Sequence, residues 1–198
     1  MERGIEFFDA QAAVWDNKRN TDEGRMRFLV SLLSVKRGGR ILDVGSGTGV
    51  LLPYLLPLIG DAGRIVAVDF SAKMLEISKA KGFGGNITYK CADILEFELV
   101  DNSFDLIVSL NFFPHLTSLG DKRAYIKKAV AALAPGGQLV VMHDISRTQV
   151  NGVHEHKPET LNDKLPAVRD TGGLFFEAGL GDVFGIEDDY IYFLRGIK

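Results

Sequence analysis

The chain has 198 residues and a formal net charge of −3, with 46% hydrophobic and 25% charged residues. These values are typical of one globular domain with a substantial core, and the acidic balance gives no support to a nucleic-acid groove. The single cysteine, Cys91, excludes an intramolecular disulfide and a zinc site of several cysteines. No stretch approaches the roughly 18 apolar residues of a membrane span. The polar opening lacks a secretory signal pattern, so we expect a cytoplasmic protein.

Helical patterns and short apolar runs alternate along most of the chain. The predicted helices cover 22–35, 50–60, 71–82 and 121–134. The predicted strands cover 40–45, 64–70, 87–93, 104–110 and 138–144. Ser71 is a plausible N-cap, Pro135 ends the last of these helices, and Pro53 and Pro57 make the second one irregular. This alternation predicts right-handed βαβ units and a parallel sheet.

The end of the chain follows a different pattern. A long polar connection over 143–170 precedes a helix candidate at 170–179 and two strand-like segments, 181–187 and 189–196. Only Asp188 separates these two segments, which indicates a hairpin that closes the sheet. A connection of that length is unusual in a compact domain unless it has a function.

The segment ILDVGSGTGVL (41–51) alternates Gly45, Gly47 and Gly49 with Ser46 and Thr48 after a predicted strand. Glycines at such a strand-to-helix turn let a ligand approach the backbone closely. A Walker loop would need a lysine after the last glycine, and none follows. A dinucleotide fingerprint would need its third glycine at position 50, which is valine.

The chain resembles the class I S-adenosylmethionine-dependent methyltransferases in several segments that follow one another in order. These are LDVGSGTG (42–49), VAVDFSAKML (66–75), CADILEF (91–97), SFDLIVSLNFFPHL (103–116) and ALAPGGQLVV (132–141). The opening FFDAQAAVWD (7–16) is similar to the N-terminal lid helix of ubiquinone/menaquinone-type members. Any one of these motifs is common, whereas the ordered set is specific.

The resemblance implies an α/β fold: a Rossmann-like, seven-stranded, mostly parallel sheet of order 3-2-1-4-5-7-6. One strand at the end would be antiparallel, and helices would cover both faces. It implies a single domain over 1–198, with a lid region at 1–35 and an insertion at 144–170 over the acceptor site. It also implies S-adenosylmethionine as cofactor and S-adenosylhomocysteine as product.

The resemblance assigns a set of residues to the cofactor. Asp69 would hold the ribose hydroxyls, and its place 20 residues after Gly49 fits a ribose contact independently. Asp93 and Ile94 would face the adenine. The full expected set is Asp43, Gly45, Ser46, Gly47, Thr48, Gly49, Asp69, Phe70, Met74, Asp93, Ile94 and Asn111.

The acceptor residues are expected at the same edge of the sheet. Candidate contacts are Phe8, Trp15, Phe112, Arg147 and Asn151. His115, His143 and His154 are candidate bases or acceptor contacts, since histidine can take a proton near neutral pH. We expect no metal, although His143, Asp144, His154 and His156 form an alternative ligand set.

The expected activity is methyl transfer to a small-molecule acceptor. The segment at 110–114 lacks the proline pair of methyltransferases that act on nucleic-acid bases, so we expect no nucleic-acid substrate. The accepting atom, O, N, C or S, stays open, as does the choice between monomer and homodimer. The alternatives are a cofactor-binding subunit without catalysis, a methyltransferase acting on a macromolecule, and a nicotinamide-dependent oxidoreductase.

Overall fold

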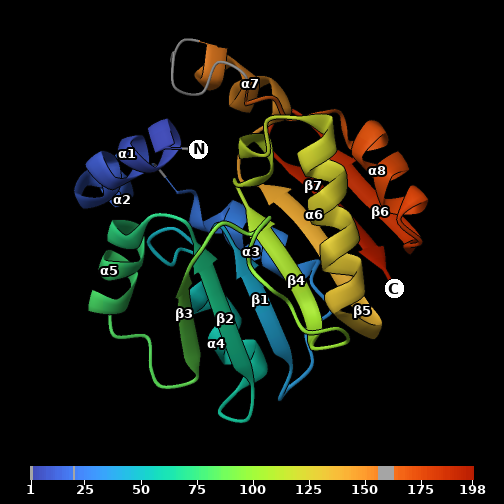
Figure 1. Ribbon diagram of the computed structural model, residues 1–198, viewed down its shortest axis with the longest axis horizontal. Coiled ribbons are helices and arrows are strands. Elements are labelled where there is room, and N and C mark those ends of the chain that lie inside the picture. Colours follow the sequence, from blue (N-terminus) through green and yellow to red (C-terminus); the bar gives the residue numbers. More distant parts are fainter. Residues whose placement is uncertain (1, 20, 156–162) are drawn as a thin grey trace.

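The computed structural model describes residues 2–19, 21–155 and 163–198, apart from the side chains of residues 2, 3 and 154. Its strands form one seven-stranded sheet of order β3-β2-β1-β4-β5-β7-β6 (Figure 1). The strands are β1 (Arg40–Val44), β2 (Arg64–Asp69), β3 (Ile87–Cys91), β4 (Phe104–Leu110), β5 (Leu133–His143), β6 (Gly181–Glu187) and β7 (Tyr192–Ile197). β1 to β5 pair in parallel, and β7 is antiparallel to both β5 and β6. The expected fold and strand order are confirmed.

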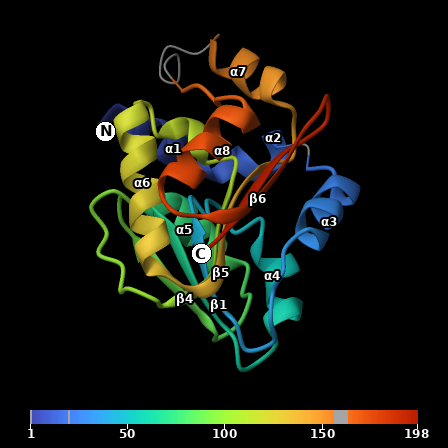
Figure 2. The ribbon, with the colours of Figure 1, turned by 90° about the vertical axis from the view of Figure 1, so that its right-hand side faces the viewer.

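Helices cover both faces of the sheet. Figure 2 shows α6 and α8 on one side and α3 and α4 on the other. The helices are α1 (Glu2–Gln11), η1 (Ala12–Val14), α2 (Trp15–Lys18), α3 (Glu23–Ser31), α4 (Leu52–Ile59), α5 (Ala72–Ala80), η2 (Phe113–His115), α6 (Leu119–Ala132), α7 (Arg147–Glu155) and α8 (Val168–Glu177). Among the described residues, no helix has the length and apolar character needed to cross a membrane.

Two apolar layers fill the space between the sheet and its helices. Successive strand residues point to opposite faces, so Ile41 belongs to the layer under α3 and α4, and Leu42 to the layer under α6 and α8. Both side chains are almost fully buried. β1 lies in the middle of the sheet and is buried on both faces, so its residues Ile41, Leu42 and Val44 are apolar without alternation.

The boundaries of several elements differ from those predicted. β5 begins at Leu133 and takes in Pro135, since the register with β4 shifts there and leaves room for an irregular start. Pro57 lies inside α4, where it removes one backbone donor. The last hairpin has a longer connection, 188–191, because β7 begins at Tyr192. The predicted N-cap is confirmed: Ser71 Oγ accepts a hydrogen bond from Met74 N at 3.1 Å.

The long connection after β5 contains a helix, α7, that its sequence did not predict. Gly152 and several polar residues give this segment little intrinsic helix preference. Contacts with distant segments compensate for it. Arg147 Nε donates to Glu187 Oε1 at 2.5 Å, and the Asn151 amide bonds both backbone groups of Leu165.

Candidate cofactor and acceptor site

The three glycines between β1 and α4 differ in what lies next to them. All have positive φ, at 67° for Gly45, 53° for Gly47 and 82° for Gly49. A Cβ on Gly45 would lie 2.5 Å from the Phe112 ring, and one on Gly49 would lie 2.3 Å from Ser78 Oγ. A Cβ on Gly47 would meet no atom of the described residues within 4 Å. The middle glycine therefore faces open space, while the outer two lie against protein.

Asp69 at the end of β2 is joined to this loop. Its Oδ2 accepts a hydrogen bond from Gly47 N at 2.8 Å, and its Oδ1 accepts one from Ser71 N at 2.9 Å. Burial raises the pKa of the carboxyl group, and these two hydrogen bonds oppose the rise. Each oxygen has a second lone pair, so the carboxylate can still accept from a ligand.

Asp43 on β1 is the most deeply buried carboxyl group of the site. It is 1% exposed, and its Oδ2 has no hydrogen-bond partner among the described residues. Burial and the nearby Asp69 carboxylate raise the pKa of Asp43 to about 7, against the influence of Arg19. A buried acceptor without a donor carries a free-energy cost that a cationic or N–H-bearing ligand could remove.

Asn111 follows β4 in a left-handed conformation, with φ of 56°. Its Nδ2 donates to Asp144 Oδ1 at 2.7 Å, whereas its Oδ1 has no partner in the part of the chain that the structure describes. Arg19 Nη2 donates to Asp144 Oδ2 at 3.2 Å. Such backbone strain is concentrated at ligand sites in proteins, and here it aims a polar side chain at the carboxyl edge of the sheet.

The N-terminal helices lie over this edge (Figure 1). Phe8 of α1 makes edge-on ring contacts with Trp15, Phe70 and His115, at centroid distances of 5.4, 5.5 and 5.1 Å. Asp9 accepts from Ser71 Oγ, and Asp16 accepts from Thr48 Oγ1, each at 2.5 Å. Residues 2–19 are called the lid below, because these contacts hold them against the glycine loop and α5.

A cleft of about 580 Å³, part of it open to solvent, lies between the lid and the sheet. Its walls combine the glycine loop, the two strand-end carboxylates and aromatic rings. The lining residues are Phe8, Trp15, Arg19, Asp43, Gly45, Ser46, Gly47, Thr48, Val50, Leu51, Asp69, Phe70, Met74, Leu110, Asn111, Phe112 and His115.

Comparison with known proteins identifies the family. Residues 41–137 match the model of a methyltransferase domain. The ubiquinone/menaquinone biosynthesis C-methyltransferase UbiE of Pseudomonas fluorescens is 33% identical over 150 residues, covering 71% of this chain and 57% of that protein. UbiE of Teredinibacter turnerae is also 33% identical over 150 residues, covering 71% and 59%. The chain belongs to the class I S-adenosylmethionine-dependent methyltransferases. It spans less than two thirds of the length of these relatives.

Solved structures agree with the fold of the methyltransferase. A methyltransferase from Aquifex aeolicus superposes with a TM-score of 0.70 at 20% identity, over 91% of this chain and 95% of the other. A chain from the complex containing the Haloferax volcanii Trm112 methyltransferase activator reaches 0.77 at 19% identity, over 96% of both chains. At such identities the likeness concerns the fold alone.

The cofactor of the methyltransferase is S-adenosylmethionine, and the residues of the cleft fit it. The molecule carries an ammonium group and a sulfonium charge. Asp43 and Asn111 line the cleft, and each has one buried oxygen without a hydrogen-bond partner among the described residues. The space beside Gly47 is open to a ligand. Of the expected cofactor residues, nine line the cleft: Asp43, Gly45, Ser46, Gly47, Thr48, Asp69, Phe70, Met74 and Asn111. Gly49 does not line it and packs against Ser78 instead.

Asp93 and Ile94 lie outside the cleft lining. Asp93 Oδ1 accepts from Leu95 N at 2.8 Å, which stabilises the turn after β3. Ile94 is 3% exposed and belongs to the apolar layer under α6. Their contact with the adenine stays a prediction.

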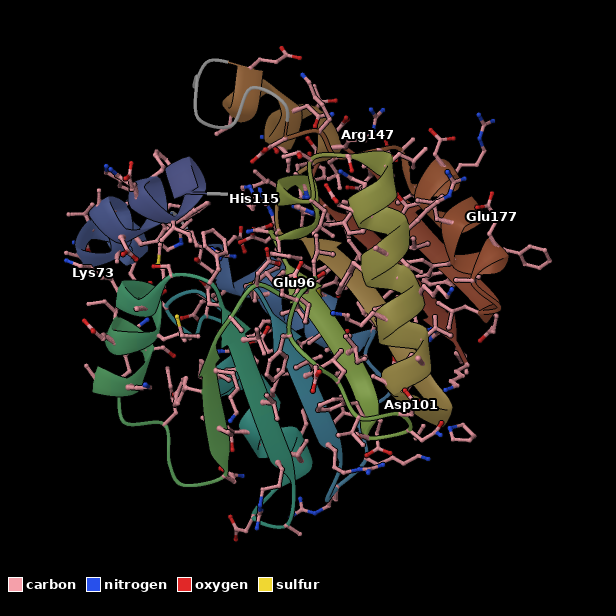
Figure 3. The ribbon with its side chains drawn as sticks, viewed as in Figure 1. Lys73, Glu96, Asp101, His115, Arg147 and Glu177 are labelled. Carbon is pink, nitrogen blue, oxygen red and sulfur yellow. The ribbon has the colours of Figure 1, made fainter. Side chains whose placement is uncertain are left out.

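The expected acceptor residues divide into two groups. Phe8, Trp15 and Phe112 line the cleft. Arg147 and Asn151 lie on α7 and contact Glu187 and Leu165, so they support the fold of the connection. Figure 3 shows His115 on the side of the lid and Arg147 farther toward α8.

The histidines are distributed over separate environments. His115 lines the cleft, whereas His143 is 1% exposed and packs edge-on against Tyr192 at 5.6 Å. Asp144 is engaged by Arg19 and Asn111. The side chain of His154 and all of His156 lie outside the described residues. Within the described residues, no three potential ligands converge on a metal position.

Sequence reasoning missed four polar residues of the site: Asp9, Asp16 and Arg19 of the lid, and Asp163, whose Oδ2 lies 2.5 Å from His115 Nδ1. Each forms a side-chain hydrogen bond with a residue at least 32 positions away in the sequence. The one sequence signal was the seven-residue spacing of Asp9 and Asp16, which would place both on one face of an uninterrupted helix. In the structure, η1 separates the two helices that carry them.

Proposed function

We propose that the protein transfers a methyl group from S-adenosylmethionine to a small-molecule acceptor. The observation that carries this proposal is the cleft itself. Gly47, which has open space beside it, lines the same cleft as Asp43 and Asn111, and each of these two has one oxygen without a partner among the described residues. These features suit a ligand with both polar donors and positive charge. The bound cofactor supplies an activated methyl group, so the protein has mainly to bind, align and desolvate the reactants.

The residues of the cleft divide this work. Asp69 offers its remaining lone pairs to ribose hydroxyls, and Phe70 and Met74 provide apolar contact beside it. Asp43 and Asn111 accept hydrogen bonds from the methionine part of the cofactor. The lid rings of Phe8 and Trp15 exclude water from the reacting atoms.

A small organic acceptor fits the remaining wall of the cleft. Phe8, Phe112 and His115 form a mostly apolar surface with one polar group. The relatives named C-methyltransferases of ubiquinone and menaquinone biosynthesis support a carbon atom as the methylated position. The acceptor is thus proposed to be a compound with an aromatic or apolar body.

Calorimetric titration with S-adenosylmethionine tests the cofactor role of Asp69. Asp69→Ala is expected to weaken binding roughly 10- to 100-fold, because a hydrogen bond to a charged group contributes about 1.5–3 kcal/mol. Asp69→Asn should lose less, since one acceptor oxygen remains. Asp61→Ala is the matched control, because Asp61 is exposed in the turn before β2, at the opposite end of the same strand. Equal affinity of wild type and Asp69→Ala would overturn the assignment.

Turnover is tested with cofactor that carries a labelled methyl group. Incubation with the small-molecule and the macromolecular fractions of a cell extract should transfer label to the small-molecule fraction. Label found in nucleic acid or protein would favour the macromolecular alternative. Tight cofactor binding without transfer to either fraction would favour a subunit that binds the cofactor without catalysis.

A further inference from the structure

His115 occupies the boundary between the cleft and the connection after β5. It ends η2, directly after β4, and its side chain is 17% exposed. On one side the imidazole contacts the lid, where the Phe8 ring lies edge-on to it at a centroid distance of 5.1 Å. The ring therefore has one side toward the cleft and little freedom to rotate.

Asp163 holds the ring from the other direction. Its Oδ2 lies 2.5 Å from His115 Nδ1, and the residue is only 6% exposed. A carboxylate can only accept, so this contact requires a proton on Nδ1. The tautomer of a histidine is set by the hydrogen bond that its other nitrogen makes. The basic nitrogen of neutral His115 is thereby Nε2.

The chain that directly follows Asp163 is fixed in place. Two residues later, the backbone N–H of Leu165 donates to Asn151 Oδ1 at 2.8 Å, and its carbonyl accepts from Asn151 Nδ2 at 3.2 Å. The Leu165 side chain is 1% exposed within the core. This gives Asn151 of α7 a role in positioning Asp163.

Lys122 supplies the charge that balances the buried carboxylate. The residue is 4% exposed, and its ammonium donates to the carbonyl of Leu116, next to His115. Burial lowers the pKa of Lys122, and the Asp163 and Asp121 carboxylates oppose this effect.

We propose that Asp163 is a positioning residue for His115, and that Nε2 of His115 takes the proton which the methyl acceptor loses. This inference rests on the proposed function. The bond between the accepting atom and its hydrogen breaks, and the proton goes to Nε2 of His115. The electron pair of that bond stays on the accepting atom and forms the new bond to the methyl carbon. The electrons of the carbon–sulfur bond leave with sulfur, and the imidazolium later returns the proton to solvent. Asp163 stabilises that imidazolium.

The pair of His115 and Asp163 suits one class of acceptor. An alcohol, a phenol or a carbon acid loses a proton on methylation and gains from a positioned base. A tertiary amine or a thioether has no such proton. The acceptor of this protein accordingly belongs to the first group.

The tautomer of His115 is measurable without any acceptor. Long-range proton–nitrogen spectra of the full chain, labelled in histidine and recorded at about pH 8.5, should show one ring protonated on Nδ1. His115→Gln assigns that signal by removing it. Asp163→Ala should move the proton to Nε2, and Asp163→Leu, which keeps the buried volume, should do the same. Lys164→Gln is the control, because it breaks only the exposed ion pair with Glu155.

Turnover provides the second readout. With an acceptor found by the labelled-methyl assay, Asp163→Ala should lower kcat by about tenfold or more, since general-base catalysis contributes about 10²- to 10⁴-fold. The KM for S-adenosylmethionine should not change. A wild-type His115 protonated on Nε2, or a tautomer unaffected by both Asp163 variants, would overturn the inference. Failure of the wild type to bind S-adenosylmethionine would instead refute the proposed function.

Discussion

Among the described residues around the cleft, buried carboxyl groups outnumber cations. Asp43, Asp69 and Asp144 are 1%, 8% and 6% exposed. Arg19 forms an ion pair with Asp144, and its positive charge opposes the rise in the pKa of Asp43. A cleft with this balance attracts a cation, because burial strengthens each electrostatic interaction relative to water. The charges on S-adenosylmethionine fit that preference.

Asp43 should make cofactor binding depend on pH. The carboxyl group has a pKa of about 7, so at lower pH it must release a proton before it can pair with a cation. Affinity for S-adenosylmethionine is therefore expected to rise about tenfold per pH unit from about pH 5 to about pH 7 and then level off. Calorimetric titrations across this range measure the slope.

Asp43→Asn is the matched variant for this prediction. It should bind the cofactor more weakly and remove the dependence of affinity on pH, so an unchanged slope would show that another group titrates.

The same substitution should stabilise the folded protein, although it weakens cofactor binding. Because the pKa of folded Asp43 lies above its usual 3.8, the wild type loses stability as pH rises from about 4 to about 7. Urea unfolding at about pH 8 should find the variant more stable, by at most about 4 kcal/mol.

At the scale of elements, substitutions in the glycine loop should affect cofactor binding and folding stability to different degrees. Gly47→Ala should weaken S-adenosylmethionine binding at least about tenfold, because the new Cβ occupies open space in the cleft. Its left-handed φ costs only about 1–2 kcal/mol of unfolding free energy. Gly45→Ala has the same backbone penalty, and its Cβ would also lie 2.5 Å from Phe112. It should therefore be the less stable variant in thermal unfolding, whereas cofactor affinity equal to wild type in Gly47→Ala would contradict this account.

The elements that could be predicted from the sequence are those whose signal is local. β1, β2 and β4 are apolar runs buried between helices, and Ser71 caps α5 with its own side chain. α7 could not be predicted, because Arg147 and Asn151 stabilise it through residues 40 and 14 positions away. Local preference decides the first kind of element, and tertiary contact decides the second.

The site divides in the same way. The glycines and Asp69 belong to compact motifs within one βαβ unit, so their pattern predicts their neighbourhood. Arg19 and Asp163 reach the site from segments 125 and 48 residues away from their partners. No spacing in the sequence encodes such a contact, because it depends on how the lid and the connection after β5 return to the sheet.

At the scale of the whole molecule, the lid is a cover joined to the body by few polar contacts. Asp9 bonds Ser71, and Asp16 bonds both Thr48 and Lys81, the latter at 2.6 Å. Burial pushes the pKa of Asp16 upward, but the hydrogen bonds from Lys81 and Thr48 outweigh it and leave the pKa below its usual value. The rest of the core lies between the sheet and the other helices. Arg19 of the lid also pairs with Asp144 at 3.2 Å. Opening of the lid thus requires the loss of these polar contacts and of the Phe8 ring contacts.

Removal of both lid carboxylates should open the cleft without unfolding the protein. In Asp9→Ala/Asp16→Ala, each partly exposed contact contributes only about 0.2–1 kcal/mol, so the melting temperature should change little. S-adenosylmethionine should bind up to about tenfold more weakly, mainly through faster dissociation. Trp15, the single tryptophan, lines the cleft and reports the change as red-shifted fluorescence.

Lys18→Ala is the control for the lid, because Lys18 bonds Gln11 within the lid itself. It should leave both the emission of Trp15 and the dissociation rate of the cofactor as in the wild type. If the double variant also matches the wild type in both measurements, the aromatic contacts of Phe8 and the Arg19–Asp144 ion pair hold the lid closed without the two carboxylates. Phe8→Ala would then produce the red shift that the loss of the carboxylates does not, since the edge-on contacts to Trp15, Phe70 and His115 all depend on that ring.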